Sequence, residues 1–441
     1  MKTLISIKMK NLVYIVLLVV FVGKVQAQDT LSIGEVVQKV LKNNHGLDLA
    51  KNNTLKSKNK TTAGNAGMLP KVDLSGGGNV SQTTADLTFA GDIPPIVGAD
   101  GESLSYNGGL NVSYNLFDGL GSIYTLKSLK TGADLMSMQE RLSIESTIYQ
   151  VYTVYYQAVN MQEQLAIAEN SLSLSRERYD RMKLKFDYGN VNSIDLLNAE
   201  VDLNNDSTGY LNAKYALRSL KRNLNLLMGG VDDIDYLVNT QINISVIESL
   251  STESKVKENN LNLLIARTNI SQAEYQKKIN QSFIMPRLII GGNYGFNYSE
   301  TNTGIVLNQQ SLGLTGSVTF AWNLFDGGKK SIQLRNAQID IENSKIAHEQ
   351  AVVSVSNDFH NAMDNYSKMK DLLSLSQKSS SVAQRNFERT KELYYQGNLS
   401  STDFRLAQLN FNRSKSQVIS SQVNLKLAEL ELKRLAGELI N

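Results

Sequence analysis

The residue types that most often carry catalysis or bind metals are scarce and poorly spaced in this chain. It contains no cysteine, which excludes a disulfide framework, a thiol nucleophile and a lipid-modified N-terminal cysteine. Its three histidines, His45, His348 and His360, share no metal-ligand spacing and have no Ser/acid set in register with them. The Gly-Gly-Lys-Lys-Ser segment at 327–331 lacks the full spacing of a P-loop. The sequence therefore predicts no enzyme, no cofactor and no metal site.

Charge and the first residues narrow the function further. The 45 Lys+Arg residues nearly balance the 42 Asp+Glu residues and form no clustered basic face, so no nucleic-acid partner is expected. Lysines precede an apolar run at 12–22, and Val-Gln-Ala at 25–27 resembles a signal-peptidase site. We interpret 1–27 as a signal peptide, because the apolar run is shorter than the roughly 20 residues of a membrane-spanning helix. The mature chain is predicted to be exported.

The chain repeats itself. The pentapeptide Asn-Leu-Phe-Asp-Gly stands at 115–119 and again at 323–327, and the same spacing of 208 residues relates Gly189 to Gly397. This regularity predicts a tandem internal duplication of rigidly packed helices. The predicted domains are a signal peptide at 1–27, a first repeat at 28–228, an equatorial linker segment at 229–254 and a second repeat at 255–441.

The two copies differ in length at one place. Pro70 and Pro286 are 216 residues apart, so the first copy holds eight additional residues before its pentapeptide. They fall in the Gly/Pro/Asp-rich stretch from Leu87 to Glu102. This composition predicts an exposed loop.

Each copy contains two segments in which apolar and polar residues alternate with a period of two. The clearest are 104–116 and 312–324, and 71–83 and 287–299 are versions diluted by glycine. A period of two is typical of β-strands. The sequence therefore predicts one hairpin of two long strands in each copy.

After the first pentapeptide the period changes to heptads. From Gly119 to about Asp187 a single helix would be roughly 100 Å long, and no proline interrupts it. This pattern is typical of a coiled coil. The positions seven residues apart are Val151, Ala158, Leu165, Leu172, Tyr179 and Phe186.

Four strands cannot close into a barrel and would leave two unpaired edges. Because the apolar face resembles the lipid-facing wall of an outer-membrane barrel, several chains must contribute, and three chains would supply 12 strands. The alternative is a secreted coiled-coil structural or adhesive protein whose strands pack in a soluble sandwich. The extended apolar face ending in Trp322 and Leu324 argues against it.

The two helix turns carry a recognisable motif, FDYGNVNSIDLLNAE at 186–200 and YYQGNLSSTDFRLAQ at 394–408. With the duplicated pentapeptide and the order of helix, hairpin, long helix and return helix, they resemble the TolC-like outer-membrane efflux proteins over essentially the whole mature chain. The resemblance implies a mixed α and β membrane protein. Its homotrimeric 12-stranded outer-membrane β-barrel, four strands per chain, would continue into a 12-helix periplasmic α-barrel.

The resemblance also implies a function. The chain would be the exit duct of a tripartite efflux or type I secretion system in the outer membrane of a Gram-negative bacterium. It would contact outer-membrane lipid, a periplasmic adaptor (membrane fusion protein) and an inner-membrane pump of RND or ABC type. Conduction would be passive, and cargo and pump class stay open. The acids Asp232, Asp233 and Asp235 lack an EF-hand's glycine and terminal glutamate. The family has a belt domain there, which also suits the strand-like residues 241–246.

The resemblance assigns a periplasmic gate. Tyr394 occupies the family's gating-tyrosine position, Asp195 that of its partner on the other hairpin, and Asp403 an aperture-ring aspartate. Leu399 and Leu406 stand where the best-known member has a gate arginine and a second ring aspartate, so we expect a simpler gate and weaker cation selectivity. The heptad seam equally allows Tyr394 to be a packing aromatic. A first-turn helix acid would equally explain Asp403.

The remaining motif residues are expected at turns and corners. Glycine followed by asparagine is suited to end a helix, and a serine with an acid two residues later is suited to begin one. By resemblance these turns form the adaptor-docking tip: Gly189, Asn190, Val191, Ser193, Gly397, Asn398, Leu399 and Ser401. The strand-helix junctions, where the aspartates are expected to cap the long helices, are Asp118, Gly119, Asp326 and Gly327.

Overall fold

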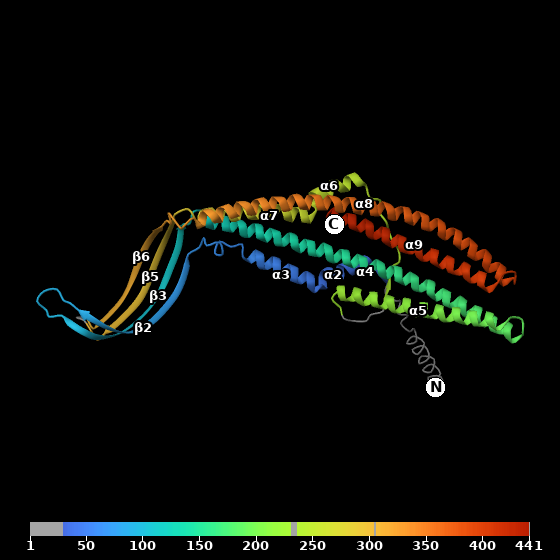
Figure 1. Cartoon of the computed structure of the whole chain (residues 1–441), viewed down its shortest axis with the longest axis horizontal. Helices are drawn as coiled ribbons and strands as arrows, with labels where there is room; N and C mark the ends of the chain where they lie inside the picture. Colours follow the sequence, from blue (N-terminus) through green and yellow to red (C-terminus); the bar gives the residue numbers. More distant parts are fainter. Residues whose placement is uncertain (1–29, 231–235, 304–305, 441) are drawn as a thin grey trace, which may run out of the picture. The chain divides into compact units, whose positions relative to one another are not determined.

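The computed structural model describes residues 30–230, 236–303 and 306–440. The predicted signal peptide and the acids Asp232, Asp233 and Asp235 lie outside the described residues. The described elements are β1 (Thr30–Leu31), α2 (Ile33–Asn43), α3 (His45–Asn59), β2 (Lys71–Leu87), β3 (Ile96–Phe117), α4 (Gly121–Asp187), α5 (Ser193–Leu227), β4 (Leu237–Val238), α6 (Ser249–Asn259), α7 (Leu261–Ser282), β5 (Arg287–Thr301), β6 (Asn308–Ala321), α8 (Lys329–Tyr395) and α9 (Ser401–Leu435) (Figure 1).

These elements form two compact units. One comprises the described residues of 30–48, 143–258 and 357–440, and the other those of 49–142 and 259–356. Each unit draws residues from both predicted repeats, and α4 and α8 contribute to both units. The sequence repeats are therefore not the compact units. No helix among the described residues has the length and apolarity needed to cross a membrane.

The second unit contains an antiparallel four-stranded sheet in the order β2-β3-β5-β6. The sheet does not close on itself, so β2 and β6 are its edges. The strands start at or before the predicted residues, and several bounds differ from the prediction. The expected loop is shorter, because β3 already begins at Ile96 and pairs with β2 as far as Leu87. β6 ends at Ala321, before Trp322, whose Nε1 donates to the Ile284 carbonyl oxygen at 3.0 Å.

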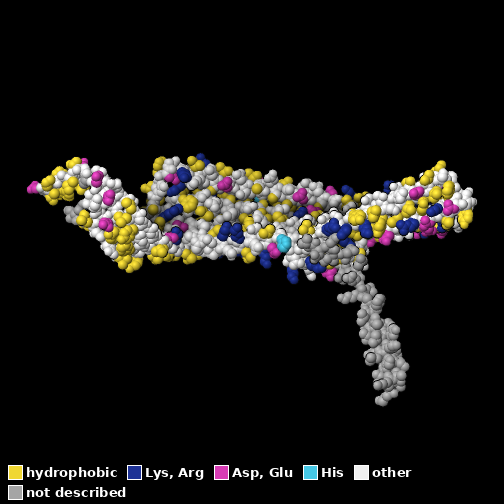
Figure 2. Space-filling model, turned by 90° about the horizontal axis from the view of Figure 1, so that it is seen from below, with side chains coloured by type: hydrophobic (Ala, Val, Ile, Leu, Met, Phe, Trp, Pro, Cys, Tyr) yellow, Lys and Arg dark blue, Asp and Glu magenta, His cyan; other side chains and the backbone are white. Residues whose placement is uncertain are grey.

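Alternation gives this sheet two different faces. Cross-strand partners share a face, and on one face Leu74 lies opposite Leu110, which lies opposite Tyr294, which lies opposite Leu314. On the other face, Asn111 Nδ2 donates to Ser75 Oγ at 2.8 Å, and Asn293 Nδ2 donates to Asn111 Oδ1 at 2.6 Å. Hydrophobic side chains gather over the strands in Figure 2. The sheet is thus apolar on one side and lined by amides and hydroxyls on the other.

The first unit contains the turns and return helices of two helical hairpins, α4–α5 and α8–α9, whose long helices also contribute to the second unit. Both long helices contain 67 residues and both return helices contain 35. Every bound of α8 and α9 lies 208 residues after the corresponding bound of α4 and α5. This equality is what a tandem duplication would produce. The expected helix from Gly119 to Asp187 is confirmed, with its start at Gly121.

A core around β1 and β4 holds the middle of this unit together. The two short strands pair in parallel, and Tyr155 Oη on α4 donates to the carbonyl oxygens of Leu31 and Asn239 at 3.0 and 3.2 Å. The strand-like pattern at 241–246 was misleading, since the structure places β4 at Leu237–Val238 and no strand at 241–246. The buried apolar residues of this core include Val36, Val40, Ile148, Val151, Ala158, Leu224, Val238 and Leu430.

Buried Glu429 on α9 secures the segment that follows β4. Its side chain is 0% exposed and accepts hydrogen bonds from Lys426 Nζ, Lys433 Nζ and the Ser245 backbone N–H. Burial raises the pKa of Glu429, but these three donors outweigh it and hold the pKa below the usual value of a glutamate carboxyl. Tyr366 Oη on α8 donates to the Ser245 carbonyl oxygen at 3.2 Å. The segment is therefore bonded to both helices of the second hairpin.

Candidate functional site at the helical turns

Both helical hairpins reverse at a glycine with a positive φ, +70° at Gly189 and +80° at Gly397. The N–H of Asn190 donates to the Lys185 carbonyl oxygen at 2.8 Å, and the N–H of Asn398 donates to that of Leu393 at 2.9 Å. This is the Schellman pattern that satisfies the last helical carbonyls. A Cβ built on either glycine meets nothing within 4 Å, so backbone conformation rather than space requires glycine there.

Both return helices begin at the serines where the sequence predicted them to start. Ser193 and Ser401 are the first helical residues, and the N-cap residues are Asn192 and Ser400. Asn192 Oδ1 accepts from the Asp195 N–H at 2.9 Å, and Ser400 Oγ accepts from the Asp403 N–H at 3.1 Å. The sequence did not identify Asn192 and Ser400 as the caps, because several adjacent residues can cap a helix and only backbone geometry decides among them.

The predicted gate residues are placed differently from one another. Asp403 lies in the first turn of α9, where its carboxylate accepts a hydrogen bond from Ser400 Oγ at 2.6 Å. Asp195 is exposed, and its carboxylate has no hydrogen-bond partner among the described residues. Within one chain, the structure does not bond Asp195 to Tyr394. An aperture formed by these acids would require neighbouring copies of the chain.

Tyr394 lies in the seam between the two hairpins. Its side chain is 7% exposed, and its ring stacks on Phe404 with centroids 4.7 Å apart and planes 5° apart. Met182 of α4 and Ala199 of α5 belong to the same cluster. The Tyr394 hydroxyl is buried and has no hydrogen-bond partner among the described residues. The single chain therefore uses Tyr394 as a packing aromatic, while its hydroxyl keeps an unused donor.

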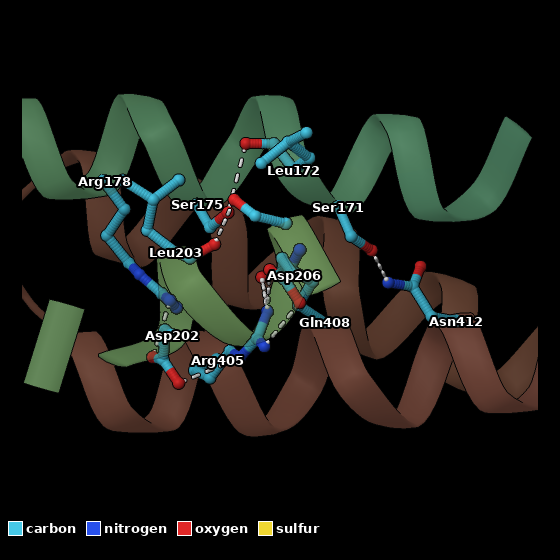
Figure 3. Close-up of polar contacts among 11 residues, drawn as sticks. Ser171, Leu172, Ser175, Arg178, Asp202, Leu203, Asp206, Arg405, Gln408 and Asn412 are labelled. Carbon is cyan, nitrogen blue, oxygen red and sulfur yellow. Dashed lines mark hydrogen bonds and ion pairs between the residues drawn. The ribbon is translucent and has the colours of Figure 1, made fainter. Parts of the chain in front are cut away.

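A charged network beside this aromatic cluster connects the hairpins (Figure 3). Arg405 of α9 donates to both carboxylate oxygens of Asp206 on α5, at 2.7 and 2.8 Å. Its Nε lies 3.6 Å from Asp202, which also accepts from Arg178 Nη2 of α4 at 2.6 Å. Bidentate arginine–carboxylate geometry combines strength with directional specificity. The pair Arg405–Asp206 is thus a direct ionic connection from one hairpin to the other.

Burial makes this network costly to disturb. The Arg178 side chain is 2% exposed, and those of Arg405 and Asp206 are each 11% exposed. Burial lowers the pKa of the Arg178 guanidinium, and neighbouring Asp202 partly opposes this shift. Two cations face two carboxylates, so the charge of these four residues balances. Removal of one member would leave a poorly solvated charge without its partner.

Neutral hydrogen bonds continue the connection along α4 and α9. Asn412 Nδ2 donates to Ser171 Oγ at 2.6 Å (Figure 3), and Ser416 Oγ donates to Gln164 Oε1 at 2.7 Å. Near the turns, Tyr395 Oη of α8 donates to Glu177 Oε1 of α4 at 2.9 Å. The two hairpins of one chain are therefore bonded at several levels.

A groove of ≈480 Å³ lies between α4, α5 and α9 on the same unit. The groove has room because Ala168 has a small side chain and Gly209 has none. The exposed Leu406 and Leu409 line the groove. Arg413 adds a cation to its wall. The groove is thus apolar in part, with charge at its margin.

The strand-helix junctions match their predicted roles as caps. Asp118 Oδ2 accepts from the Ser122 N–H at 2.7 Å, and Asp326 Oδ2 accepts from the Lys330 N–H at 3.2 Å. Gly119 has a φ of +70°, and a Cβ there would approach the Ser282 carbonyl oxygen to 2.6 Å. Gly327 has a φ of +71°. Both junctions therefore need glycine for backbone conformation, and the first also needs it for space.

Sequence reasoning missed the residues of the charged network. Asp202 and Asp206 are four apart on one helix, a spacing that places them on a single face. Arg405 corresponds to Leu197 at the repeat spacing of 208, so a cation replaces an apolar residue beside the seam. That substitution was the available signal. Within the described part of the chain, no group of three or more His, Asp or Glu side chains is placed to hold a metal ion.

Comparison with solved structures shows the same fold in bacterial membrane proteins. A membrane protein from Pseudomonas aeruginosa is 16% identical, with a TM-score of 0.77 over 92% of this chain and 90% of that one. The CmeC outer membrane channel of Campylobacter jejuni is 19% identical, with a TM-score of 0.76 over 92% and 86%. The open state of the Neisseria gonorrhoeae MtrE outer membrane channel is 16% identical, with a TM-score of 0.71 over 92% and 89%.

Comparison with curated protein sequences finds no match. The sequence model of the outer membrane efflux protein family matches residues 36–230 and 253–438, which together make up most of the chain. These two segments coincide with the two predicted repeats to within a few residues at the linker, and they include both turns, both junctions and the charged network. The chain belongs to the outer membrane efflux protein family.

Proposed function

We propose that three copies of this chain form the outer-membrane exit duct of a tripartite efflux or type I secretion system. The duct conducts substrates passively from a periplasmic adaptor and an inner-membrane pump to the exterior of a Gram-negative bacterium. The observation that most directly supports this proposal is the open sheet with one apolar face. Leu74 and Leu314 on that face are 82% and 79% exposed in the single chain, which only lipid or another apolar surface would cover.

The sheet edges support the trimer. β2 and β6 each present a row of unpaired backbone groups, which cannot persist in the hydrocarbon of a membrane. Pairing β2 of one copy with β6 of the next removes both edges, and three copies give a closed barrel of 12 strands. Its amide- and hydroxyl-lined face would then surround a water-filled lumen, with the apolar face toward lipid.

The helices supply the periplasmic part of the proposed duct. With α4, α5, α8 and α9 from each copy, a trimer would have a tunnel wall of 12 helices. The turns at Gly189 and Gly397 would form its tip, and the groove lined by Leu406 and Leu409 offers a seat for a helical hairpin of an adaptor. The predicted docking residues around both turns do not line this groove and would form a separate part of the docking surface.

Gating would then depend on the contacts between hairpins. We assign Asp403 and Asp195 to the aperture formed by neighbouring copies, and Tyr394 to the seam that must repack when the aperture widens. The Arg405–Asp206 pair would restrain this movement inside each copy, because a displacement of α9 from α5 breaks both of its hydrogen bonds. No group of the chain is assigned to catalysis, and the pump would supply the energy.

Assembly and conduction test this proposal together. The protein extracted in mild detergent should have the mass of three chains and should insert into planar bilayers as a discrete channel. A secreted coiled-coil protein, the alternative function, would give no channel. A stable monomer in mild detergent would contradict the trimer, and a trimer that never conducts would contradict the duct.

A further inference from the structure

One hairpin of the sheet continues past the end of the other. Ser103 of β3 pairs with Thr301, the last residue of β5, whereas β2 and β3 keep pairing from Gln82 and Glu102 to Leu87 and Ile96. Figure 1 shows this β2–β3 hairpin extending beyond β5 and β6. We call residues 83–101 the projecting hairpin. Each chain has one, because the second half lacks the additional residues.

Along the projecting hairpin, the apolar and polar residues exchange faces relative to the body of the sheet. In the body of the sheet, the face that carries Val80 and Leu104 is apolar, and the face that carries Ser81 and Ser103 is polar, with their hydroxyls 2.9 Å apart. Further out, the first face instead carries Thr84, whose hydroxyl donates to Asp100 at 2.8 Å.

The other face becomes apolar over the same residues. Ala85 and Leu87 continue the alternation of Ser81, because side chains two residues apart in a strand share a face. Ile96 pairs with Leu87 and shares that face. In the proposed barrel, the apolar side of the projecting hairpin is therefore the side that continues the lumen wall.

A bulge fixes the path of this hairpin. The register shifts between Ala85 and Leu87, where Gly98 has a φ of +72°. The Gly98 N–H donates to Asp86 Oδ1 at 2.8 Å, which holds that carboxylate at the bulge. Bulges bend the strand that contains them, so the tip departs from the direction of the sheet. At the tip, Ile93 is 55% exposed although it is apolar.

The reach of the projecting hairpin suits the mouth of a 12-stranded barrel. Five further residue pairs at about 3.3 Å each extend it by roughly 17 Å. A barrel of 12 strands, spaced about 4.8 Å apart and tilted by about 40°, has a radius of about 12 Å. Three hairpins that lean inward are therefore long enough to meet at the barrel axis.

We propose that the projecting hairpins of three copies meet over the outer mouth of the duct and close it with an apolar contact made by Leu87, Ile93 and Ile96. This inference rests on the proposed trimeric duct. The site is incomplete in one chain, because each hairpin's apolar face finds its partner only in the two other copies. The duct is then closed at two ends by different chemistry, ionic at the periplasmic turns and apolar at the exterior.

Charge distribution favours a second copy of the chain as the occupant of this face. Residues 72–126 contain no Lys or Arg, so no cation offsets the acids of the hairpin. Asp100 lies on the face opposite Leu87, and Asp86 is bonded to the bulge. Three hairpins can therefore join the faces of Leu87 and Ile96 without bringing Asp86 and Asp100 together, which leaves Asp92, beside Ile93, as the acid nearest the contact.

Cross-linking tests the contact directly, because a chain without cysteine gives single-cysteine variants a clean background. Ile93→Cys in trimers should form a covalent dimer under mild oxidation, with the third copy left over. Val306→Cys, an equally exposed apolar position in the β5–β6 turn, is the matched control and should stay uncrosslinked. Equal cross-linking of the two variants, or none at Ile93→Cys, would overturn the proposed contact.

Labelling from outside the cell tests closure. Asn297→Cys places a thiol on the polar face of the sheet, and a second variant also replaces residues 88–95 with an Asn-Gly turn. A bulky maleimide added outside should label the shortened variant at least about tenfold faster, because the joined hairpins obstruct it, while a small maleimide that passes beside the joined tips should label both variants. Rapid bulky labelling of the full-length hairpin would refute closure. If the small reagent labels neither variant, that result would instead contradict the water-filled barrel and with it the proposed duct.

Discussion

Replacing Arg405 with alanine should open the periplasmic end of the duct. Removing one partner of a buried ion pair costs about 3–5 kcal/mol, and the 11% exposure of Arg405 and Asp206 argues for the lower end. If widening breaks the pair anyway, the substitution removes about 3 kcal/mol of restraint from the closed form. At about 1.4 kcal/mol per tenfold change, the equilibrium of each protomer would shift toward opening by roughly 100-fold.

Single-channel recording on purified trimers measures this shift. Arg405→Ala should raise the conductance or the open fraction, and Asp206→Ala should do the same, since each removes the same two hydrogen bonds. The double variant should add little to either single variant, because both substitutions delete one interaction. The conductance of Arg405→Lys should fall between that of the wild type and that of Arg405→Ala, since lysine keeps the charge and loses the bidentate geometry.

A matched arginine in the same unit provides the control. Arg389 is paired with Glu392 on its own helix, and its side chain is 73% exposed, so Arg389→Ala should leave conductance and trimer melting nearly unchanged. If Arg405→Ala lowers the melting temperature yet conducts like the wild type, the pair holds the fold together and does not restrain opening. That result would refute the reasoning.

Four further outcomes are expected. Gly397→Val should reduce export more than trimer yield, because a β-branched residue is strained at positive φ in the proposed docking turn; a parallel loss of both would make the glycine merely structural. Asp195→Ala with Tyr394→Phe should raise conductance in bilayers, and no change would leave Tyr394 as a packing residue. Asp403→Asn should lower cation preference in reversal potentials if three carboxylates line the aperture. Because the pKa of Glu429 is lowered in the fold, its carboxylate stabilises the protein above the pKa of an unfolded glutamate, and this contribution is lost as pH falls through the lowered value. Glu429→Gln should therefore melt lower than the wild type at pH 7, with the difference shrinking in acid.

Local patterns predicted the elements well. Heptad spacing predicted α4, and alternation predicted the hairpins, because both periods follow from backbone geometry that needs no distant partner. The position of a cap was less predictable. Asn192 and Ser400 share their neighbourhoods with other capping residues, and the choice depends on how the turn before them closes.

Contacts between distant segments were not predictable in the same way. Arg405 and Asp206 are 199 residues apart, and nothing in the spacing of either reveals the other. The role of Tyr394 could not be decided from the sequence either. Only the fold shows that its ring stacks on Phe404 and that its hydroxyl has no hydrogen-bond partner among the described residues. The projecting hairpin was predictable in part from local pattern and in part only from the fold. Its additional residues were evident, but the reversal of its faces required the strand register.

Leu120 gives the two halves of the chain different mechanics. It follows Gly119 with a φ of 69°, in the left-handed region that branched side chains rarely occupy, while the equivalent position in the second half is Gly328 with a φ of +86°. The first corner between sheet and helix is therefore stiff and strained, and the second is compliant. Around the proposed trimer, six such corners would alternate in stiffness. A wall built from twelve similar helices would then bend with threefold rather than sixfold symmetry, and a twist applied at one end would reach the other unevenly.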